Sequence, residues 1–373
     1  PPRYVNRHGY LQAIIESTQK RVDAAKQERS LDDLRWRAEE QAAGGQAGNA
    51  KRRTEELAAD GQAGATNGQA GPASRQAEEQ AANKQAGATN RQVGPTNRQV
   101  TNGQAVKDES RPFLDAISKP GLSFICEVKQ ASPSKGQIVA NFDHLSIARD
   151  YEEAGADALS VLTEPVYFRG DSRYLAEIAK QVKIPVLRKD FVLDEYQIYE
   201  SRVLGASAIL LIVAILDDGQ LGAFLELSER LGMEALVETH NKEELQRALT
   251  VGARIVGVNN RDLKTFKVDI GVSERLRPLV PSDVVYVAES GIGTASDLQR
   301  MVRAKADAVL VGEALMQASE RRDKLLEFRE IAGGTEVHTV EGAGKATSTA
   351  AGKAAGKAAV TAAVTGAGRG EGR

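Results

Sequence analysis

The segment FICEVKQASPSKG, Phe124–Gly136, begins as an apolar run and ends in charged and turn-forming residues. Glu127 and Lys129 are two positions apart, so in an extended strand their side chains point to the same face. Opposite charges at the end of an apolar strand are costly to bury and add little to packing, and they are typical of a catalytic or binding site. The following small polar residues, 132–136, favour a loop.

Seven further apolar runs follow this one, and amphipathic helical segments alternate with them. Such runs are typical of a parallel sheet that helices cover. Eight strand–helix units favour a (β/α)8 TIM barrel over an open doubly wound sheet, and no GxGxxG follows the first strand. The predicted strands are SFICEVK from Ser123, ALSVLT from Ala158, PVLRKDF from Pro185, AILLIV from Ala208, EALVET from Glu234, IVGVNN from Ile255, VYVAES from Val285 and AVLVGE from Ala308.

Composition divides the 373-residue chain into four parts. Residues 4–43 are predicted to form a helical extension that packs on the barrel, and residues 107–332 to form the barrel. The segments 44–106 and 333–373 are low in complexity and cannot bury enough apolar surface to offset chain entropy, so both are predicted to be disordered. Within the extension, core packing is the expectation for Trp36.

Composition also argues against several classes of protein. A net charge of −2 and an aromatic content of 5% do not suggest a nucleic-acid surface. No run of about 18 apolar residues is present, so no membrane span is expected. The single cysteine, Cys126, lies inside the first predicted strand and is expected to be a small buried residue. We therefore expect a cytoplasmic protein without a disulfide framework.

Six of the eight predicted strands end in polar side chains. In this type of barrel the active site lies at the C-terminal ends of the strands, so these side chains are predicted to meet at one mouth. Structural salt bridges are the alternative, and some of the charges are expected to form them. The residues are Glu127, Lys129, Thr163, Glu164, Lys189, Asp190, Glu238, Asn259, Arg261, Glu289 and Ser290.

The last two units carry a second signal, a glycine at the strand-to-helix turn. It occurs in AESGIGT, Ala288–Thr294, and in VGEAL, Val311–Leu315. Free backbone N–H groups at a helix start bind anions, and the loops after strands seven and eight of such barrels commonly hold phosphate. A plain tight turn is the alternative at each position. Two such turns in these units favour a phosphorylated ligand.

Together these segments resemble the indole-3-glycerol phosphate synthase family of tryptophan biosynthesis, over residues 4–43 and 107–332. The motifs are EVKQASPSKG, TEPVYFRG, VLRKDF with YQIYESRVLGA, LVETH, GVNNRDL, AESGI and VLVGEALM. The resemblance implies a lyase without cofactor or metal. It would convert 1-(2-carboxyphenylamino)-1-deoxyribulose 5-phosphate to indole-3-glycerol phosphate, CO₂ and water, with other tryptophan-pathway enzymes as partners. The segment 44–106 departs from the family, whose link is much shorter.

The resemblance also implies the catalytic roles. Lys189 is expected to be the general acid at the ketone oxygen, and Glu238 the general base for dehydration. Lys129 is expected to pair with the anionic ends of the substrate, and it could share the acid role. Glu127 would orient Lys129, and Asn259 would hold a substrate hydroxyl.

Further residues are implied to bind substrate. Arg261 is expected to pair with nearby carboxylates, Glu127 being one candidate. Glu313 is expected to offer only its backbone N–H to the phosphate, with its side chain pointing away. His240 is interpreted as a loop or helix-cap residue. The other binding residues are Ser132 for the carboxylate, Phe168, Phe191, Leu210, Leu263 and Leu310 for the aromatic ring, and Ser290, Gly291 and Gly312 for the phosphate.

Alternatives remain open at this point. Phe168 and Phe191 could be ordinary core residues. The chain could be another phosphate-binding barrel, such as a Schiff-base aldolase that uses Lys129 or Lys189. It could also be a catalytically inactive barrel that serves as a binding subunit, although such a barrel would be expected to lack a Lys or Glu at the mouth. The loop 132–136 is expected to be a mobile flap.

Overall fold

The computed structural model describes residues 9–44 and 112–333. The two segments predicted to be disordered, 44–106 and 333–373, therefore lie outside the described residues except for Gly44 and Gly333. Within the described ranges, no helix has the length and apolar character needed to cross a membrane.

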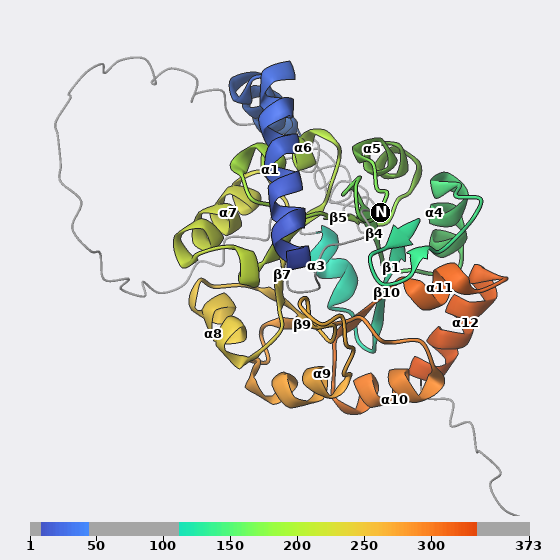
Figure 1. Ribbon diagram of the computed structural model, residues 1–373. Coiled ribbons are helices and arrows are strands. Elements are labelled where there is room, and N and C mark those ends of the chain that lie inside the picture. Colours follow the sequence, from blue (N-terminus) through green and yellow to red (C-terminus); the bar gives the residue numbers. More distant parts are fainter. Residues whose placement is uncertain (1–8, 45–111, 334–373) are drawn as a thin grey trace, which may run out of the picture. The chain divides into compact units, whose positions relative to one another are not determined.

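Eight parallel strands close into a barrel in the order β1-β10-β9-β8-β7-β6-β5-β4, and helices surround it (Figure 1). Each strand coincides with a predicted apolar run, so the predicted (β/α)8 barrel is confirmed. The strands are β1 (Ser123–Val128), β4 (Ala158–Leu162), β5 (Val186–Lys189), β6 (Ala208–Ile212), β7 (Glu234–Thr239), β8 (Ile255–Asn259), β9 (Val285–Glu289) and β10 (Ala308–Val311). The first strand pairs with the last, with Ser123 opposite Ala308.

Most of the surrounding helices begin at a side chain that caps their first turn. Asp143, Asp171, Asp194, Asp217, Asn241 and Thr294 each accept a hydrogen bond from a backbone N–H of the helix that follows. The helices are α4 (His144–Glu153), α5 (Ser172–Gln181), α6 (Glu195–Val203), α7 (Asp218–Arg230), α8 (Lys242–Thr250), α9 (Gly271–Leu276), α10 (Ala295–Arg303), α11 (Glu313–Gln317) and α12 (Arg321–Ala332), with short 3-10 helices η2 (Val213–Ile215) and η3 (Arg277–Leu279).

The barrel has two apolar cores because side chains alternate along each strand. One core fills the barrel interior and includes Ile125, Leu187 and Leu236. The other lies between strands and helices and includes Phe124 and Cys126. Cys126 is fully buried, as expected. The alternation places Glu127, Lys189, Glu238 and Glu289 on the inward side of their strands, two residues beyond interior apolar positions, and Asn259 on the inward side of β8, four residues beyond Ile255.

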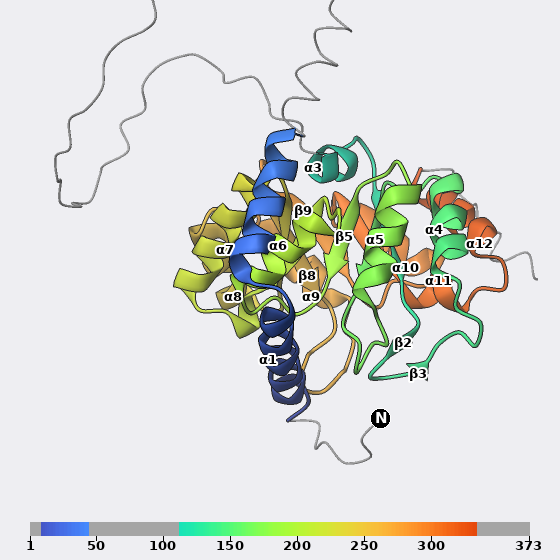
Figure 2. The same cartoon turned by 90° about the horizontal axis from the view of Figure 1, so that it is seen from above.

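A short helix before the barrel, α3 (Pro112–Ile117), packs against the interior core at the N-terminal ends of the strands. Its Phe113 and Ile117 are completely buried. The side view places α3 at the opposite end of the barrel from the β2 and β3 hairpin (Figure 2). The N-terminal end of the barrel is therefore filled, and the polar strand ends lie at the other end.

The N-terminal extension consists of α1 (Tyr10–Glu28) and a helical stretch over residues 31–44. The break comes at Arg29, whose backbone is extended with φ −139° and ψ 125°. Ile14, Val22 and Leu34 are buried. Trp36 is 62% exposed, so the expectation of core packing is wrong. Leu34 and Ala38 share the buried face of the helix, and Trp36, two positions from each, does not lie on that face.

Candidate active site

All of the predicted catalytic and substrate-binding residues line one pocket at the C-terminal ends of the strands, whereas Thr163 and Glu164, also predicted at the mouth, do not. Its volume is about 1180 Å³, large enough for a substrate of drug-like size. The strands supply charged side chains at the mouth, and the interior core supplies the apolar floor. The extension contributes Tyr10, Leu11 and Ile14, which also line the pocket.

Lys189, at the end of β5, lies between two carboxylates. Its Nζ is 2.9 Å from Oε2 of Glu238 on β7 and 3.3 Å from Oε2 of Glu289 on β9. Both carboxylate side chains are 2% exposed, and that of Lys189 is 14% exposed. The three charges meet although the strands are far apart in sequence, because all three side chains occupy inward positions.

Burial and mutual attraction set the protonation of this trio. Burial alone would lower the pKa of Lys189, but Glu238 and Glu289 outweigh it and raise the pKa overall. Burial would raise the pKa of Glu238, but Lys189 and then His240 lower it well below its usual value. Burial raises the pKa of Glu289, Lys189 opposes that shift, Glu238 adds to it, and the result is about 8. The trio therefore favours a protonated lysine and an ionised Glu238, and Glu289 is the carboxyl that keeps its proton to the higher pH.

Glu238 is fixed by partners on both of its oxygens. Asn259 Nδ2 donates to Oε1 at 3.2 Å, and Lys189 Nζ donates to Oε2 at 2.9 Å. The other end of the Asn259 amide, Oδ1, accepts the backbone N–H of Arg261 at 3.0 Å. This second contact sets the direction in which the Asn259 amide points, and the carboxylate of Glu238 is held in one orientation.

Glu127 and Lys129 form an ion pair at the end of β1. Lys129 Nζ donates to Glu127 Oε1 at 2.5 Å. This contact is the one through which Glu127 would orient Lys129, and that role stays a prediction. The loop that follows contains a short hairpin, β2 (Ala131–Ser132) and β3 (Gly136–Gln137), which the sequence reading gave only as a loop. Ser132 Oγ accepts the backbone N–H of Lys135 at 3.3 Å and closes its turn.

The predicted aromatic-ring site is an apolar slot beside the charged trio. Phe191, Leu210 and Leu310 belong to the interior core, and Phe168 and Leu263 pack against it. The ring centroids of Phe168 and Phe191 are 6.3 Å apart. Because all five residues also line the pocket, the two phenylalanines are core residues and pocket residues at the same time.

The two predicted phosphate turns have unusual backbone geometry. After β9, Ser290 and Gly291 both have positive φ, 65° and 80°, a region that costs a non-glycine residue energy. After β10, a Cβ at Gly312 would lie 2.6 Å from Oε1 of Glu127. Glycine at 312 therefore lets the backbone turn beside the Glu127 carboxylate.

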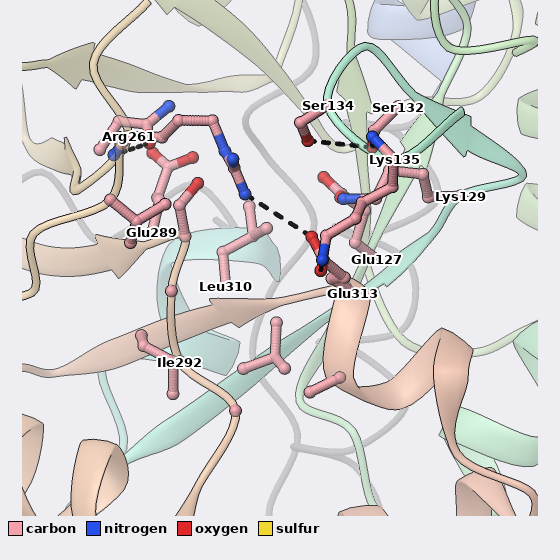
Figure 3. Close-up of a pocket in the computed structure, with 18 of the residues that line it drawn as sticks. Glu127, Lys129, Ser132, Ser134, Lys135, Arg261, Glu289, Ile292, Leu310 and Glu313 are labelled. Atoms are coloured by element: carbon pink, nitrogen blue, oxygen red, sulfur yellow. Dashed lines mark hydrogen bonds and ion pairs between the residues drawn. The ribbon is translucent and has the colours of Figure 1, made fainter. Parts of the chain in front are cut away.

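The side chain of Glu313 does not point away from the site, which corrects the prediction. Its Oε1 is 3.3 Å from Lys135 Nζ, and its Oε2 is 3.6 Å from a terminal nitrogen of Arg261. Arg261 and Lys135 approach it from opposite sides of the mouth (Figure 3). Arg261 thus pairs with a nearby carboxylate, as expected, but among the described ion pairs its partner is Glu313 and not the candidate Glu127. Lys135 and Arg261 make the inward orientation of the Glu313 carboxylate favourable. The sequence alone does not show that these two cations lie beside it.

Several polar strand ends are structural, as the alternative interpretation allowed. Asp190 faces away from the barrel interior and binds Arg188 at 3.2 Å and Arg21 of α1 at 2.8 Å. Thr163 Oγ1 donates to Asp190 Oδ2 at 2.7 Å. Glu164 accepts three backbone N–H groups of its own loop, from residues 166–168. These side chains hold the framework beneath the mouth.

Sequence reasoning placed Glu289 at the mouth but gave it no role. The available signal was its position as the acid that ends a strand in AESGI. Its Oε1 is buried without a hydrogen bond among the described residues, and a Cβ at Gly257 would collide with that atom. His240 is a second residue at the site whose contacts the sequence did not show. It contacts Glu244 at the start of α8, as a cap residue should, and its ring also lies beside Glu238.

No cluster suited to a metal ion occurs among residues 9–44 and 112–333.

The matching family model and three similar proteins carry the same name. A family model described as "Indole-3-glycerol phosphate synthase" matches residues 77–328, more than half of the chain. A protein of that name from Lachnoclostridium phytofermentans is 54% identical over 219 residues, which cover 59% of this chain and 81% of the relative. Namesakes from Endomicrobium trichonymphae and Lacticaseibacillus paracasei are 54% and 52% identical over 58% and 59% of this chain, and 84% and 85% of their own lengths are covered.

Proposed function

The chain belongs to the indole-3-glycerol phosphate synthase family, and from that premise we propose how its barrel mouth carries out the reaction. It is a carboxy-lyase of tryptophan biosynthesis that acts on a phosphorylated small molecule. The substrate 1-(2-carboxyphenylamino)-1-deoxyribulose 5-phosphate closes its second ring and loses CO₂ and water. The observation that carries the proposed mechanism is the Lys189 ammonium held 2.9 Å from the Glu238 carboxylate inside the pocket.

In the first step, the ring carbon that bears the carboxylate attacks the ketone carbon of the same molecule. The ketone oxygen gains negative charge, and Lys189 donates a proton to it while the ammonium stabilises that charge. Lys129 binds the substrate carboxylate, with Ser132 beside it. The slot of Phe168 and Phe191 holds the aromatic ring so that the two reacting carbons meet.

In the second step, the carboxylate leaves as CO₂, and its bonding electrons restore the aromatic ring. The hydroxyl formed from the ketone then leaves as water. Because Lys189 has already given its proton to the ketone oxygen, Lys129 donates this second proton. Glu238 removes a proton from the carbon next to the nitrogen, which forms the indole double bond. Asn259 holds a substrate hydroxyl, and the turns at Ser290, Gly291 and Gly312 bind the phosphate with the backbone N–H of Glu313.

The charge of Lys189 separates this mechanism from a Schiff-base aldolase. A Schiff-base lysine must be neutral to attack a carbonyl, so such sites lower its pKa. Here the two neighbouring carboxylates raise the pKa of Lys189. We therefore expect borohydride, added with substrate, to leave the protein unlabelled. A covalent adduct at Lys189 or Lys129 would overturn the mechanism.

Replacement of Lys189 by alanine tests the acid role. We expect Lys189→Ala to lower turnover, measured by the fluorescence of indole-3-glycerol phosphate, by about 10²–10⁴-fold. Binding of an unreactive phosphate analogue should persist, because the phosphate turns lie on β9 and β10. Lys180→Ala, at an exposed position on α5, is the matched control. Near-normal turnover of Lys189→Ala would refute the assigned role.

A further inference from the structure

His240 is a largely buried histidine beside the proposed base, and no step of the proposed mechanism uses it. It follows Glu238 by two residues at the end of β7, so both side chains project to the same side of the chain. Its side chain is 11% exposed. One ring nitrogen, Nε2, is 3.4 Å from Glu238 Oε1, and the other, Nδ1, is 3.0 Å from Glu244 Oε2.

Glu244 fixes the direction of the His240 ring. Its Oε2 also accepts the backbone N–H of His240 at 2.8 Å, and its Oε1 accepts Nδ2 of Asn241 at 2.8 Å. A carboxylate with these partners in the first turn of α8 cannot follow the ring if the ring moves. It therefore holds Nδ1 and leaves Nε2 facing the base.

The Nε2 atom of His240 has no hydrogen-bond partner among the described residues. It is buried, and a buried polar atom without a partner is costly. The acidic atom within ion-pair distance of it is Oε1 of Glu238, the oxygen that also accepts Asn259 at 3.2 Å. We propose that His240, anchored by Glu244, is a positioning residue that holds the Glu238 carboxylate in its reactive orientation.

The charges around the ring support this arrangement. Glu238 faces His240 from β7, Glu244 faces it from α8, and Asp262 is near enough in the loop after β8 to feel its charge. Burial would lower the pKa of His240, but the close approach of Glu238 and the hydrogen-bonded Glu244 raise it to about 10. A cation at this point balances the three carboxylates without contacting the substrate pocket, which His240 does not line.

The proposal rests on the role of Glu238 as the base, and two variants of His240 test it. Asparagine places an amide near the position of Nδ1 and keeps the contact with Glu244, whereas glutamine reaches the position of Nε2 and keeps a donor to Glu238. We expect His240→Asn to lower kcat by about tenfold or more, part of what a general base contributes, with little change in KM. His240→Gln should recover most of the loss.

Both variants remove the cation, so both should move the acidic limb of the kcat/KM profile to higher pH. Glu243→Gln, an exposed carboxylate of the same helix, is the matched control and should leave kcat and the profile unchanged. A uniform loss of folded protein would lower kcat without moving the limb, and it would not distinguish Asn from Gln.

Titration of His240 by NMR gives a readout that does not depend on activity. The chain has four histidines, and the signal absent from His240→Asn identifies the one at 240. We expect this ring to stay protonated through pH 8 in the wild-type protein and to titrate at lower pH in Glu238→Gln.

The outcomes separate the two proposals. Near-normal turnover in Glu238→Gln would overturn the base itself, and the role of His240 with it. Loss of turnover in Glu238→Gln, together with wild-type kcat in His240→Asn and an unchanged titration of His240, would overturn only the positioning role.

Discussion

At the scale of single residues, neighbours in sequence have opposite tasks. Lys189 points into the barrel and faces Glu238, whereas Arg188 and Asp190, on either side of it, point outward. Arg188 is fully buried and binds Asp190 at 3.2 Å and Glu200 at 2.7 Å. The outward pair thus fixes the backbone on both sides of the proposed acid. A change at 188 or 190 should therefore misplace Lys189 even though neither side chain enters the reaction.

Glu289 gives a prediction about stability and pH. Its pKa is about 8 in the folded protein and about 4.5 when exposed. Between these values the folded protein binds a proton that the unfolded chain has lost, so the free energy of unfolding falls as pH rises and levels off above pH 8. Glu289→Gln lacks the titrating carboxyl and therefore this pH-dependent contribution to the free energy of unfolding. We expect its stability relative to wild type to increase from pH 5 to pH 8 in urea denaturation.

The control for this measurement is Glu243→Gln, which removes an exposed carboxylate of α8. Its stability relative to wild type should change little with pH over the same range. A difference between Glu289→Gln and wild type that stays constant from pH 5 to pH 8 would contradict the raised pKa of Glu289.

At the scale of elements, the β2–β3 hairpin is tied to the barrel through Glu313. Lys135 in its turn and Arg261 after β8 both contact that carboxylate. The same two cations would attract a substrate phosphate, so Glu313 competes with it for them. We expect Glu313→Gln to lower KM several-fold at low salt, with kcat nearly unchanged.

Ionic strength provides the check on this prediction. Because screening weakens exposed charge pairs, the advantage of Glu313→Gln should shrink as salt increases. Inorganic phosphate should also inhibit this variant at lower concentration than it inhibits wild type. An unchanged KM at low salt would contradict this competition, and a higher KM would show that Glu313 supports phosphate binding through its side chain.

The helix α1 is joined to the barrel by a two-bond contact. Arg21 donates to both oxygens of Asp190, at 2.9 and 2.8 Å, and the same helix carries Tyr10, Leu11 and Ile14 to the pocket wall. We expect Arg21→Met to cost about 2 kcal/mol of stability and to raise KM more than it lowers kcat. The loss stays moderate because Asp190 keeps Arg188 and Thr163 as partners.

Urea denaturation and steady-state kinetics measure the two effects of Arg21→Met. Lys20→Met, an exposed cation beside it on α1, should change neither quantity. If Arg21→Met has wild-type stability and KM, then the extension is held to the barrel by its apolar face alone.

At the scale of the whole molecule, the sequence determines the barrel well because its signal is repeated. Each of the eight strands is an apolar run, and each polar end follows from the alternation of side chains. What the sequence could not show are contacts between side chains of distant elements. The inward turn of Glu313 depends on Lys135 and Arg261, and the second contact of His240 depends on the orientation of Glu238. The exposure of Trp36 depends on which face of its helix meets the barrel.

The pairing of Ser123 with Ala308 has a consequence for synthesis of the chain. The first strand of the barrel gains one of its two neighbours only after almost the entire barrel sequence has left the ribosome. Until then β1 and the newest strand each present a row of unpaired N–H and C=O groups, which other chains can extend. A product truncated before Ala308 keeps both open edges and is prone to aggregate, so the cell gains a usable protein only from a chain translated through the last strand.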